Sequence, residues 1–118
     1  MMISVMDSSL SALSAYSVKM RVTANNVANV NTDGFKKSRT TMQEGTWGGV
    51  APDVDRVDTP GMPKQIVEDG VIRDVEASNV DLAEEITDTL STQTAYQANL
   101  KAVEATDEML GNLLDAIG

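Results

Sequence analysis

Both ends of the chain carry a stripe of residues spaced alternately four and three apart. This spacing places the members of each stripe on one face of an α-helix. The stripe near the N-terminus comprises Met6, Leu10, Leu13, Ser17, Met20, Ala24 and Val27. The longer stripe near the C-terminus comprises Leu82, Ile86, Thr89, Gln93, Tyr96, Leu100, Val103, Asp107, Leu110, Leu114 and Ile117. We therefore expect a mainly α protein whose long N- and C-terminal helices form a coiled-coil-like pair.

The stripes divide the chain into three parts. These parts are an N-terminal helical segment with an Asn-rich turn (1–41), a Gly- and Pro-bearing middle (42–77), and a long C-terminal helix (78–118). The first helix is expected at about 5–29, and its Asn cluster weakens it before the turn that contains Gly34. The second helix is expected at about 80–117, after an N-cap at Ser78 or Asn79.

The middle part predicts little regular structure. Residues 35–42 are polar with β-branched members and predict a short extended segment, whereas the glycines and prolines of 45–61 predict a loop. Asp69-Gly70 lies between two short apolar couples, which is a hairpin signal. We expect a small hairpin there, with strands at 65–67 and 71–73.

Composition excludes most catalytic chemistry. The 118 residues contain no cysteine and no histidine, which removes thiol nucleophiles, disulfides and the commonest general base and metal ligand. No segment approaches the roughly 18 apolar residues of a membrane-spanning helix. The first residues have neither a basic stretch nor a sustained apolar stretch, so no secretory signal peptide is expected.

The net charge of −9 is unevenly distributed. Residues 1–40 hold five basic and two acidic residues, so the remainder carries a net charge of −12. A basic head and an acidic tail attract each other within or between chains, or the charges solvate outer helix faces. Scattered basic residues on an acidic chain argue against a nucleic-acid partner.

Two acidic patterns resemble functional sites and are better explained as structure. Asn29-x-Asn31-x-Asp33-Gly34 imitates the start of a calcium-binding loop, but Thr40 stands where a bidentate Glu is needed. The pattern is therefore assigned to a turn. The paired carboxylates at 53/55 and 84/85 have no partner residues for acid–base catalysis, so they are assigned to solvated surface. We expect no cofactor, no metal and no enzyme activity.

The two stripes could pair within one chain or between chains. A hairpin of the two helices explains them without any partner. The C-terminal stripe is longer by about three turns, however, and its polar members Thr89, Gln93 and Asp107 are of a kind that fixes register and partner. An apolar excess left bare on a monomer favours contacts with other subunits. Assembly is the preferred interpretation.

Two longer motifs carry a family resemblance. Residues 24–36 read ANNVANVNTDGFK, and residues 78–99 read SNVDLAEEITDTLSTQTAYQAN. The first resembles the N-terminal signature of the bacterial flagellar basal-body rod and hook proteins, and the second resembles their C-terminal signature. Counting the adjoining residues, the resemblance covers about two thirds of the chain, in the family's order. The short middle part resembles the proximal-rod class, while the turn at 31–34 and the run at 93–99 are closer to distal-rod and hook members.

The resemblance implies a structural subunit of the flagellar axial structure. Such subunits stack helically through their terminal helices into a tube that transmits torque. It also implies partners, namely other copies of the chain, other rod and hook proteins, and the type III export apparatus, and a place in the periplasmic rod of the basal body. A non-axial helical adaptor related to rod proteins is the alternative.

The residues expected to form the assembly interface come from both stripes and from the Asn cluster. They are Leu10, Leu13, Met20, Asn25, Asn26, Val27, Asn29, Leu82, Ile86, Tyr96, Leu100, Val103, Leu110 and Leu114. The apolar members are expected to pack helix against helix. The asparagines are expected to tie the end of the first helix to a neighbour, because buried amides must find partners.

Overall fold

The computed structural model describes residues 2–117 and shows two long helices separated by two hairpins. In chain order the elements are α1 (Met2–Ala28), β1 (Ser38–Glu44), β2 (Val50–Arg56), β3 (Pro63–Glu68), β4 (Val71–Glu76) and α2 (Leu82–Ile117). The molecule is a rod of 80 × 24 × 19 Å. The expected fold class, two long terminal helices in contact with short β structure between them, is confirmed.

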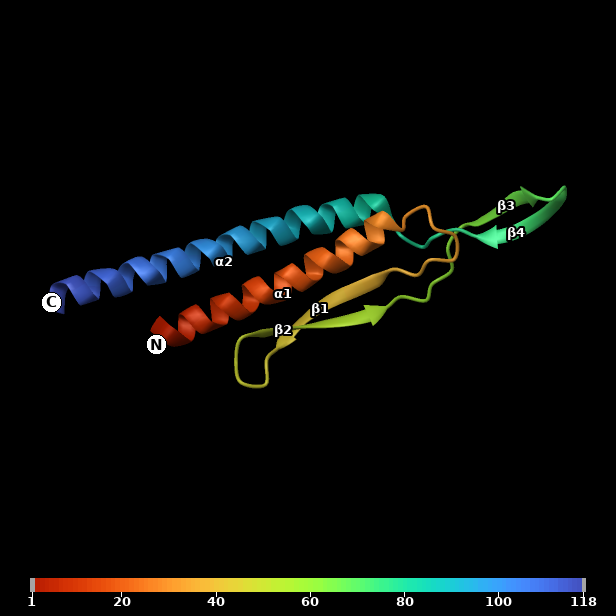
Figure 1. The fold of residues 1–118 in the computed structure, drawn as a ribbon. Coiled ribbons are helices and arrows are strands. Elements are labelled where there is room, and N and C mark those ends of the chain that lie inside the picture. The colour runs from red at the N-terminus through yellow and green to blue at the C-terminus, as the bar shows by residue number, and fades with distance from the viewer. Residues whose placement is uncertain (1, 118) are drawn as a thin grey trace.

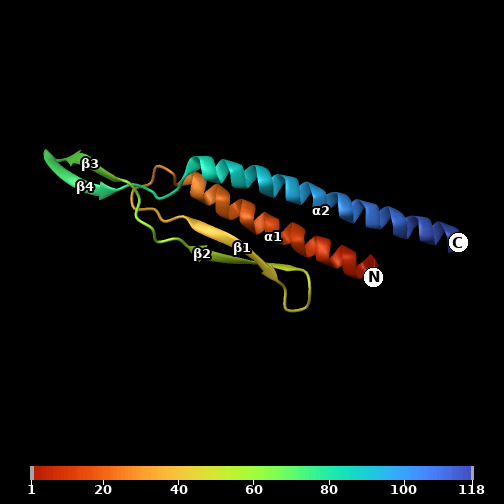
Figure 2. The same ribbon diagram turned by 180° about the vertical axis from the view of Figure 1, so that it is seen from behind.

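The elements lie side by side rather than around a central core. Figures 1 and 2 show α1 and α2 running in opposite directions, with the β1–β2 hairpin along α1. The β3–β4 hairpin lies beyond the end of the helix pair where α1 finishes and α2 begins, away from the two chain termini. Helix α1 contacts α2, β1 and β2, whereas α2 makes no comparable contact with either strand. Helix α1 is therefore the middle layer. Since α2 has 36 residues and α1 has 27, α2 extends past the start of α1.

The Asn cluster ends α1 as the sequence predicts. Asn29 Nδ2 donates to the Asn25 carbonyl at 2.8 Å, and Thr32 Oγ1 donates to Asn29 Oδ1 at 3.1 Å. Gly34 follows with φ = +74°, a conformation that glycine adopts without strain. These side-chain bonds add to the last backbone bonds of the helix, from Asn29 N–H to the Asn25 and Asn26 carbonyls at 3.2 and 3.1 Å, and hold the chain where it leaves α1.

The N-cap of α2 differs from the prediction. Asp81 is the cap, because its Oδ1 accepts hydrogen bonds from the Ala83 and Glu84 backbone N–H groups at 3.0 and 3.4 Å. Neither Ser78 nor Asn79 bonds to the first turn of α2; the Asn79 side chain binds other segments instead. The helix consequently begins at Leu82, two residues later than expected.

The predicted β3–β4 hairpin is confirmed and is longer than expected. Its turn is Asp69-Gly70, with φ of +53° and +76°, which are the positive values that a type I′ turn requires. The loop predicted at 45–61 is wrong over Val50–Arg56, which forms β2 and pairs with β1 from Glu44↔Val50 to Ser38↔Arg56. Pro52 misled the prediction. A two-stranded hairpin consists of edge strands, and edge strands accommodate proline.

Candidate assembly surface

The seam between α1 and α2 is lined by small and polar side chains. On α1 the buried residues include Ser9, Ala12, Thr23 and Asn26. On α2 the buried residues are Glu85, Thr92 and Thr106, spaced by seven and fourteen residues. A seven-residue spacing returns to the same face of a helix after two turns, so these side chains point at α1 along its length.

This seam buries little apolar surface. Among the described residues only Ala12 and Ala15 are fully buried hydrophobic residues. The Thr92 hydroxyl, which lies in the seam, has no hydrogen-bond partner within residues 2–117. Apolar burial contributes roughly 25 cal/mol per Å², so alanine contacts stabilise the helix pair far less than leucine contacts would. The small side chains let the two helices approach closely but bind them weakly.

The predicted apolar stripes lie beside the seam and remain largely exposed. Leu100 is 41 % exposed and Leu114 is 69 % exposed. The exposed members of the predicted interface are Leu10, Val27, Leu82, Ile86, Tyr96, Leu100 and Leu114. The half-buried members are Leu13, Met20, Val103 and Leu110. Within the chain, most of the apolar surface predicted to pack is therefore still available.

The two stripes meet at a groove between the helices. Tyr16, Met20 and Ala24 of α1 face Thr92, Gln93 and Tyr96 of α2 across a cavity of about 370 Å³. Met20 and Tyr96, one from each predicted stripe, thus line the same depression. The groove also contains Ser17 and Gln93, so both stripes run along this side of the helix pair. We call this side, formed by the two stripes and the groove, the apolar face.

The Asn cluster is used differently from the stripes. Asn26, 2 % exposed, donates from Nδ2 to the Ser38 carbonyl at 2.8 Å and accepts at Oδ1 from Ser38 N–H at 3.0 Å. Its Nδ2 also reaches Glu85 Oε1 at 3.4 Å. One amide therefore connects α1, β1 and α2. Asn25 is exposed, and Asn29 caps α1. The hydrogen-bond partners of Asn26 and Asn29 therefore lie within the chain, whereas the sequence predicted a tie to a neighbouring subunit.

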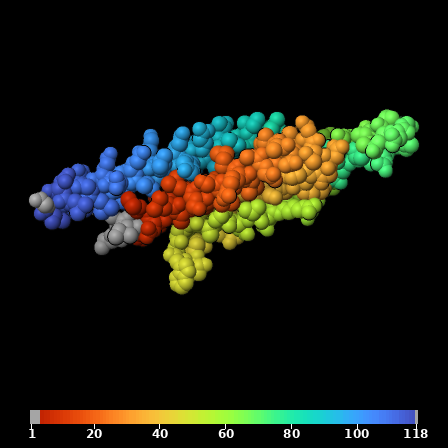
Figure 3. Space-filling view, viewed as in Figure 1, coloured from red at the N-terminus to blue at the C-terminus, as the bar shows by residue number. Residues whose placement is uncertain are grey.

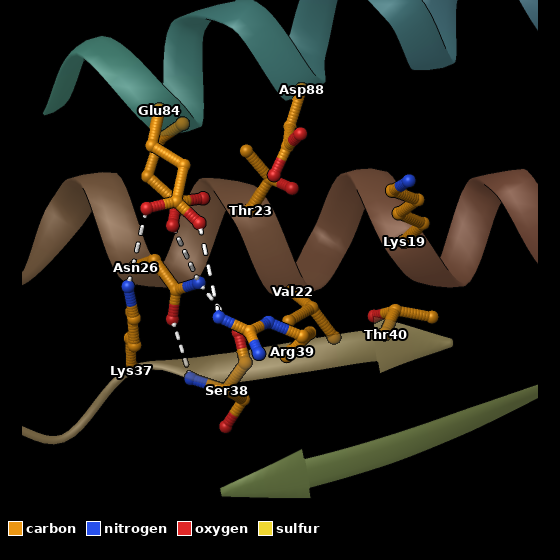
Figure 4. A pocket seen from close by; sticks show the side chains of 11 residues that line it. Lys19, Val22, Thr23, Asn26, Lys37, Ser38, Arg39, Thr40, Glu84 and Asp88 are labelled. Atoms are coloured by element: carbon orange, nitrogen blue, oxygen red, sulfur yellow. Dashed lines mark hydrogen bonds and ion pairs between the residues drawn. The ribbon is translucent and has the colours of Figure 1, made fainter. Parts of the chain in front are cut away.

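Charged residues surround Asn26 in a polar pocket of about 260 Å³ (Figure 4). Lys37 Nζ lies 3.4 Å from Glu84 Oε2, and Arg39 reaches the other oxygen of Glu84 at 3.9 Å. Burial raises the pKa of Glu85, and the Asn26 hydrogen bond opposes that rise only partly. The carboxyl group of Glu85 therefore ionises less readily in the folded chain than in the unfolded one.

A second set of bonds joins the loops to the helix ends. Asn79 Oδ1 accepts from Lys37 N–H at 2.7 Å, and its Nδ2 donates to the Val57 and Thr59 carbonyls at 2.8 and 2.9 Å. Glu76 binds Lys36 Nζ and accepts from Gly61 N–H at 2.6 Å. The Lys36 hydrogen bond, followed by that of Gly61, lowers the pKa of Glu76. We call these residues together with Asn26, Ser38 and Glu85 the junction.

Comparison with known protein families decides the identity. Residues 6–36 match the family model described as flagella basal body rod protein. Residues 74–116 match the model described as flagellar basal body rod FlgEFG protein C-terminal. The chain belongs to the flagellar basal-body rod protein family. This is a structural family rather than an enzymatic one, which confirms both the resemblance and the expected lack of catalysis.

No curated protein matched the rod-family chain. Within the part of the chain that the structure describes, neither helix is long and apolar enough to cross a membrane, and no group of His, Cys, Asp and Glu residues is arranged to hold a metal ion.

The two family signatures contribute part of the junction. Asn26 belongs to the first signature, and Asn79 and Glu85 belong to the second, whereas their partner residues at 37, 38, 57 and 59 lie outside both. Sequence reasoning missed the partners of these residues, since a hydrogen bond between positions 26 and 85 leaves no periodic signal. It also expected the helices to pack through the apolar stripes rather than through the seam. Small residues in helical register at 9, 12 and 15 were the available indication, because small side chains permit close helix approach.

Proposed function

We propose that this rod-family chain is a structural subunit of the flagellar rod that assembles into a helical tube through its apolar face. The observation that supports the proposal is that the two sides of the helices differ in burial. The small, polar seam is used within the chain, and the leucine-rich stripes beside it are left uncovered. Contiguous exposed apolar surface of this kind is typical of an interface.

The same arrangement explains how such a subunit would carry load. Subunits joined by a contact that does not close on itself form a helical filament. Apolar side chains interdigitating along two helices about 40 and 54 Å long resist both sliding and twisting. Family membership implies a place in the basal body. The finer location in the periplasmic rod, export through the type III apparatus, and contacts with other rod and hook proteins extend this proposal.

A helical adaptor outside the axial structure is the second candidate. It is favoured by one observation, that α1 and α2 already pair within the single chain. An adaptor of this kind would need only one partner on its apolar face and would stay discrete.

Concentration-dependent assembly separates the two candidates. The purified chain would be followed by analytical ultracentrifugation and negative-stain electron microscopy from micromolar to near-millimolar concentration. A rod subunit forms species that grow with concentration and appear as short tubes or fibres. A discrete monomer or dimer over the whole range, with no tube after seeding with isolated rods, contradicts the proposal and supports the adaptor.

A further inference from the structure

The tip of the β1–β2 hairpin presents the only tryptophan of the chain to solvent. Trp47 is 98 % exposed, although tryptophan is usually well buried in folded proteins. Space-filling atoms of the hairpin tip project from the side of the rod in Figure 3. An indole ring left in water exposes a large apolar area that contributes strongly to interfaces when buried.

The loop that carries Trp47 is held in a defined shape. Gly45 N–H donates to the Gly49 carbonyl at 3.0 Å, and Gly48 N–H donates to the Gly45 carbonyl at 3.1 Å. The base of the loop is fixed to α1, since Val50 N–H donates to Ser11 Oγ at 3.0 Å. Gly49 packs against Ser11 with φ = +74°, a position closed to other residues. The backbone of such a preorganised loop loses little entropy on binding.

The groove of the apolar face is suited to receive an indole ring. Its cavity of about 370 Å³ lies at the small end of the roughly 300–1,000 Å³ range of pockets that enclose compact ligands. Two tyrosine rings, Tyr16 and Tyr96, form its walls, and Met20 lines it as well. Aromatic pairs and methionine–aromatic contacts are both favourable.

The charges next to the Trp47 loop and next to the groove are opposite in sign. Glu44 is exposed at the end of β1, three residues before Trp47, and Arg21 is exposed on the rim of the groove. Neither residue forms an ion pair within residues 2–117. An arginine beside the groove can pair with Glu44 and stack on an indole face.

The two features lie on opposite sides of α1, so one molecule cannot join them. Ser11 faces the hairpin, and Met20, which faces the groove, follows it by nine residues. At 3.6 residues per turn, nine residues correspond to two and a half turns and hence to the opposite face of the helix. A projection on one side and a fitting groove on the other make a head-to-tail contact that can repeat from one copy to the next.

We propose that Trp47 of one copy inserts into the Tyr16–Met20–Tyr96 groove of a second copy, with Glu44 beside the second copy's Arg21. This inference rests on the proposed function and specifies one of its contacts. The contact links the β1–β2 hairpin of each subunit to the apolar face of the next.

Tryptophan fluorescence tests the contact directly, because Trp47 is the only tryptophan. Its emission in the dispersed chain is expected at the long wavelength of a hydrated indole, and it is expected to shift to shorter wavelength on assembly. Trp47→Ala is expected to raise the critical concentration by at least about tenfold. Val54→Ala, which truncates another exposed apolar side chain of the same hairpin, is the matched control and should leave it unchanged.

Mixing two defective variants shows that the contact is between chains. Trp47→Ala lacks the projection, and Ala24→Arg fills the groove at an exposed position, so each alone is expected to stay monomeric at concentrations where the parent chain assembles. Mixed together they should form a one-to-one complex, in which the intact tryptophan of one occupies the intact groove of the other. Arg21→Glu should weaken assembly, and Glu44→Arg in the same chain should restore it.

The outcomes separate this inference from the proposed function. Assemblies whose Trp47 emission stays at the hydrated wavelength overturn the contact and leave the proposed function standing. A shift that appears only after another axial protein is added overturns the second copy as the occupant. A chain that forms no assembly under any condition removes the proposed function and this contact with it.

Discussion

The junction and the apolar face differ in whether their side chains find partners within the molecule. At the junction, amides and charged groups bind each other across segments far apart in the chain, and the Asn26 amide alone joins three elements. Along the apolar face, leucines and isoleucines of both helices stay in solvent while alanines and threonines fill the seam. The hydrogen-bonding groups of the junction are paired within the molecule, whereas the large apolar side chains remain on its surface.

This contrast shows how a thin subunit can have a defined shape without a substantial core. Hydrogen bonds fix geometry because each donor binds few acceptors, whereas apolar contacts supply free energy with little directional preference. The junction therefore sets the angle at which the helices and hairpins meet. The free energy that would stabilise a globular core remains available for contacts with neighbours.

The strongest test of the contrast is a charge on the apolar face. Leu100→Asp is expected to raise the critical concentration for assembly by at least about a hundredfold, because a carboxylate would be buried without a partner. The unfolding free energy of the monomer should change by less than about 1 kcal/mol, since Leu100 is 41 % exposed there. Sedimentation and urea denaturation measure the two effects.

Lys101→Asp, on the exposed neighbouring position, is the control. Normal assembly of Leu100→Asp would remove residue 100 from the interface.

The reverse test breaks the junction and leaves the apolar face intact. Asn26→Ala removes the bonds to both backbone groups of Ser38 and the contact with Glu85. Unpaired buried groups cost about 1–3 kcal/mol each, so the unfolding free energy should fall by about 3 kcal/mol in urea denaturation. Asn25→Ala, at the exposed neighbouring position, should cost no more than about 0.5 kcal/mol. Equal effects of the two substitutions would contradict the role of Asn26.

A smaller effect is expected from the buried carboxylate of the junction. The folded-state pKa of Glu85 is raised, so its ionisation lowers the stability of the fold as pH rises through the unfolded and then the folded pKa. Glu85→Gln keeps an oxygen for Asn26 and removes the charge. It should raise the thermal midpoint at neutral pH, and the gain should disappear below the unfolded pKa of Glu. A gain that is the same at every pH would assign the effect to packing instead.

The smallest effect is expected at Glu76, with the opposite dependence on pH. Lys36 and Gly61 lower the folded-state pKa of Glu76, so its stabilising effect is present above the unfolded pKa and is lost as pH falls through the folded pKa. Glu76→Gln should therefore be slightly less stable than the parent at neutral pH and equally stable in acid. Parallel thermal melts across this range check the sign, and a variant more stable at neutral pH would contradict it.

Local patterns in the sequence predicted most of the elements but not their meeting points. Helical periodicity placed α1 and α2 within a few residues, and Asp69-Gly70 placed the β3–β4 turn. The β2 strand was missed because Pro52 and the nearby glycines imitate a loop. The packing of the apolar stripes stays a prediction, and the stripes could not show whether the partner is the same chain, since a stripe looks identical in both cases. The junction depends on contacts between distant positions, which no periodicity encodes.

Site-specific labelling can measure whether the apolar face becomes buried on assembly, since the chain has no cysteine of its own. Leu100→Cys and the seam variant Thr92→Cys would each be treated with a maleimide reagent in the dispersed and the assembled protein. Position 100 is expected to react rapidly in the dispersed chain and at least about tenfold more slowly once assembled, while position 92, 2 % exposed, reacts slowly in both states. Equal reactivity of position 100 before and after assembly would show that the apolar face is not the interface between subunits.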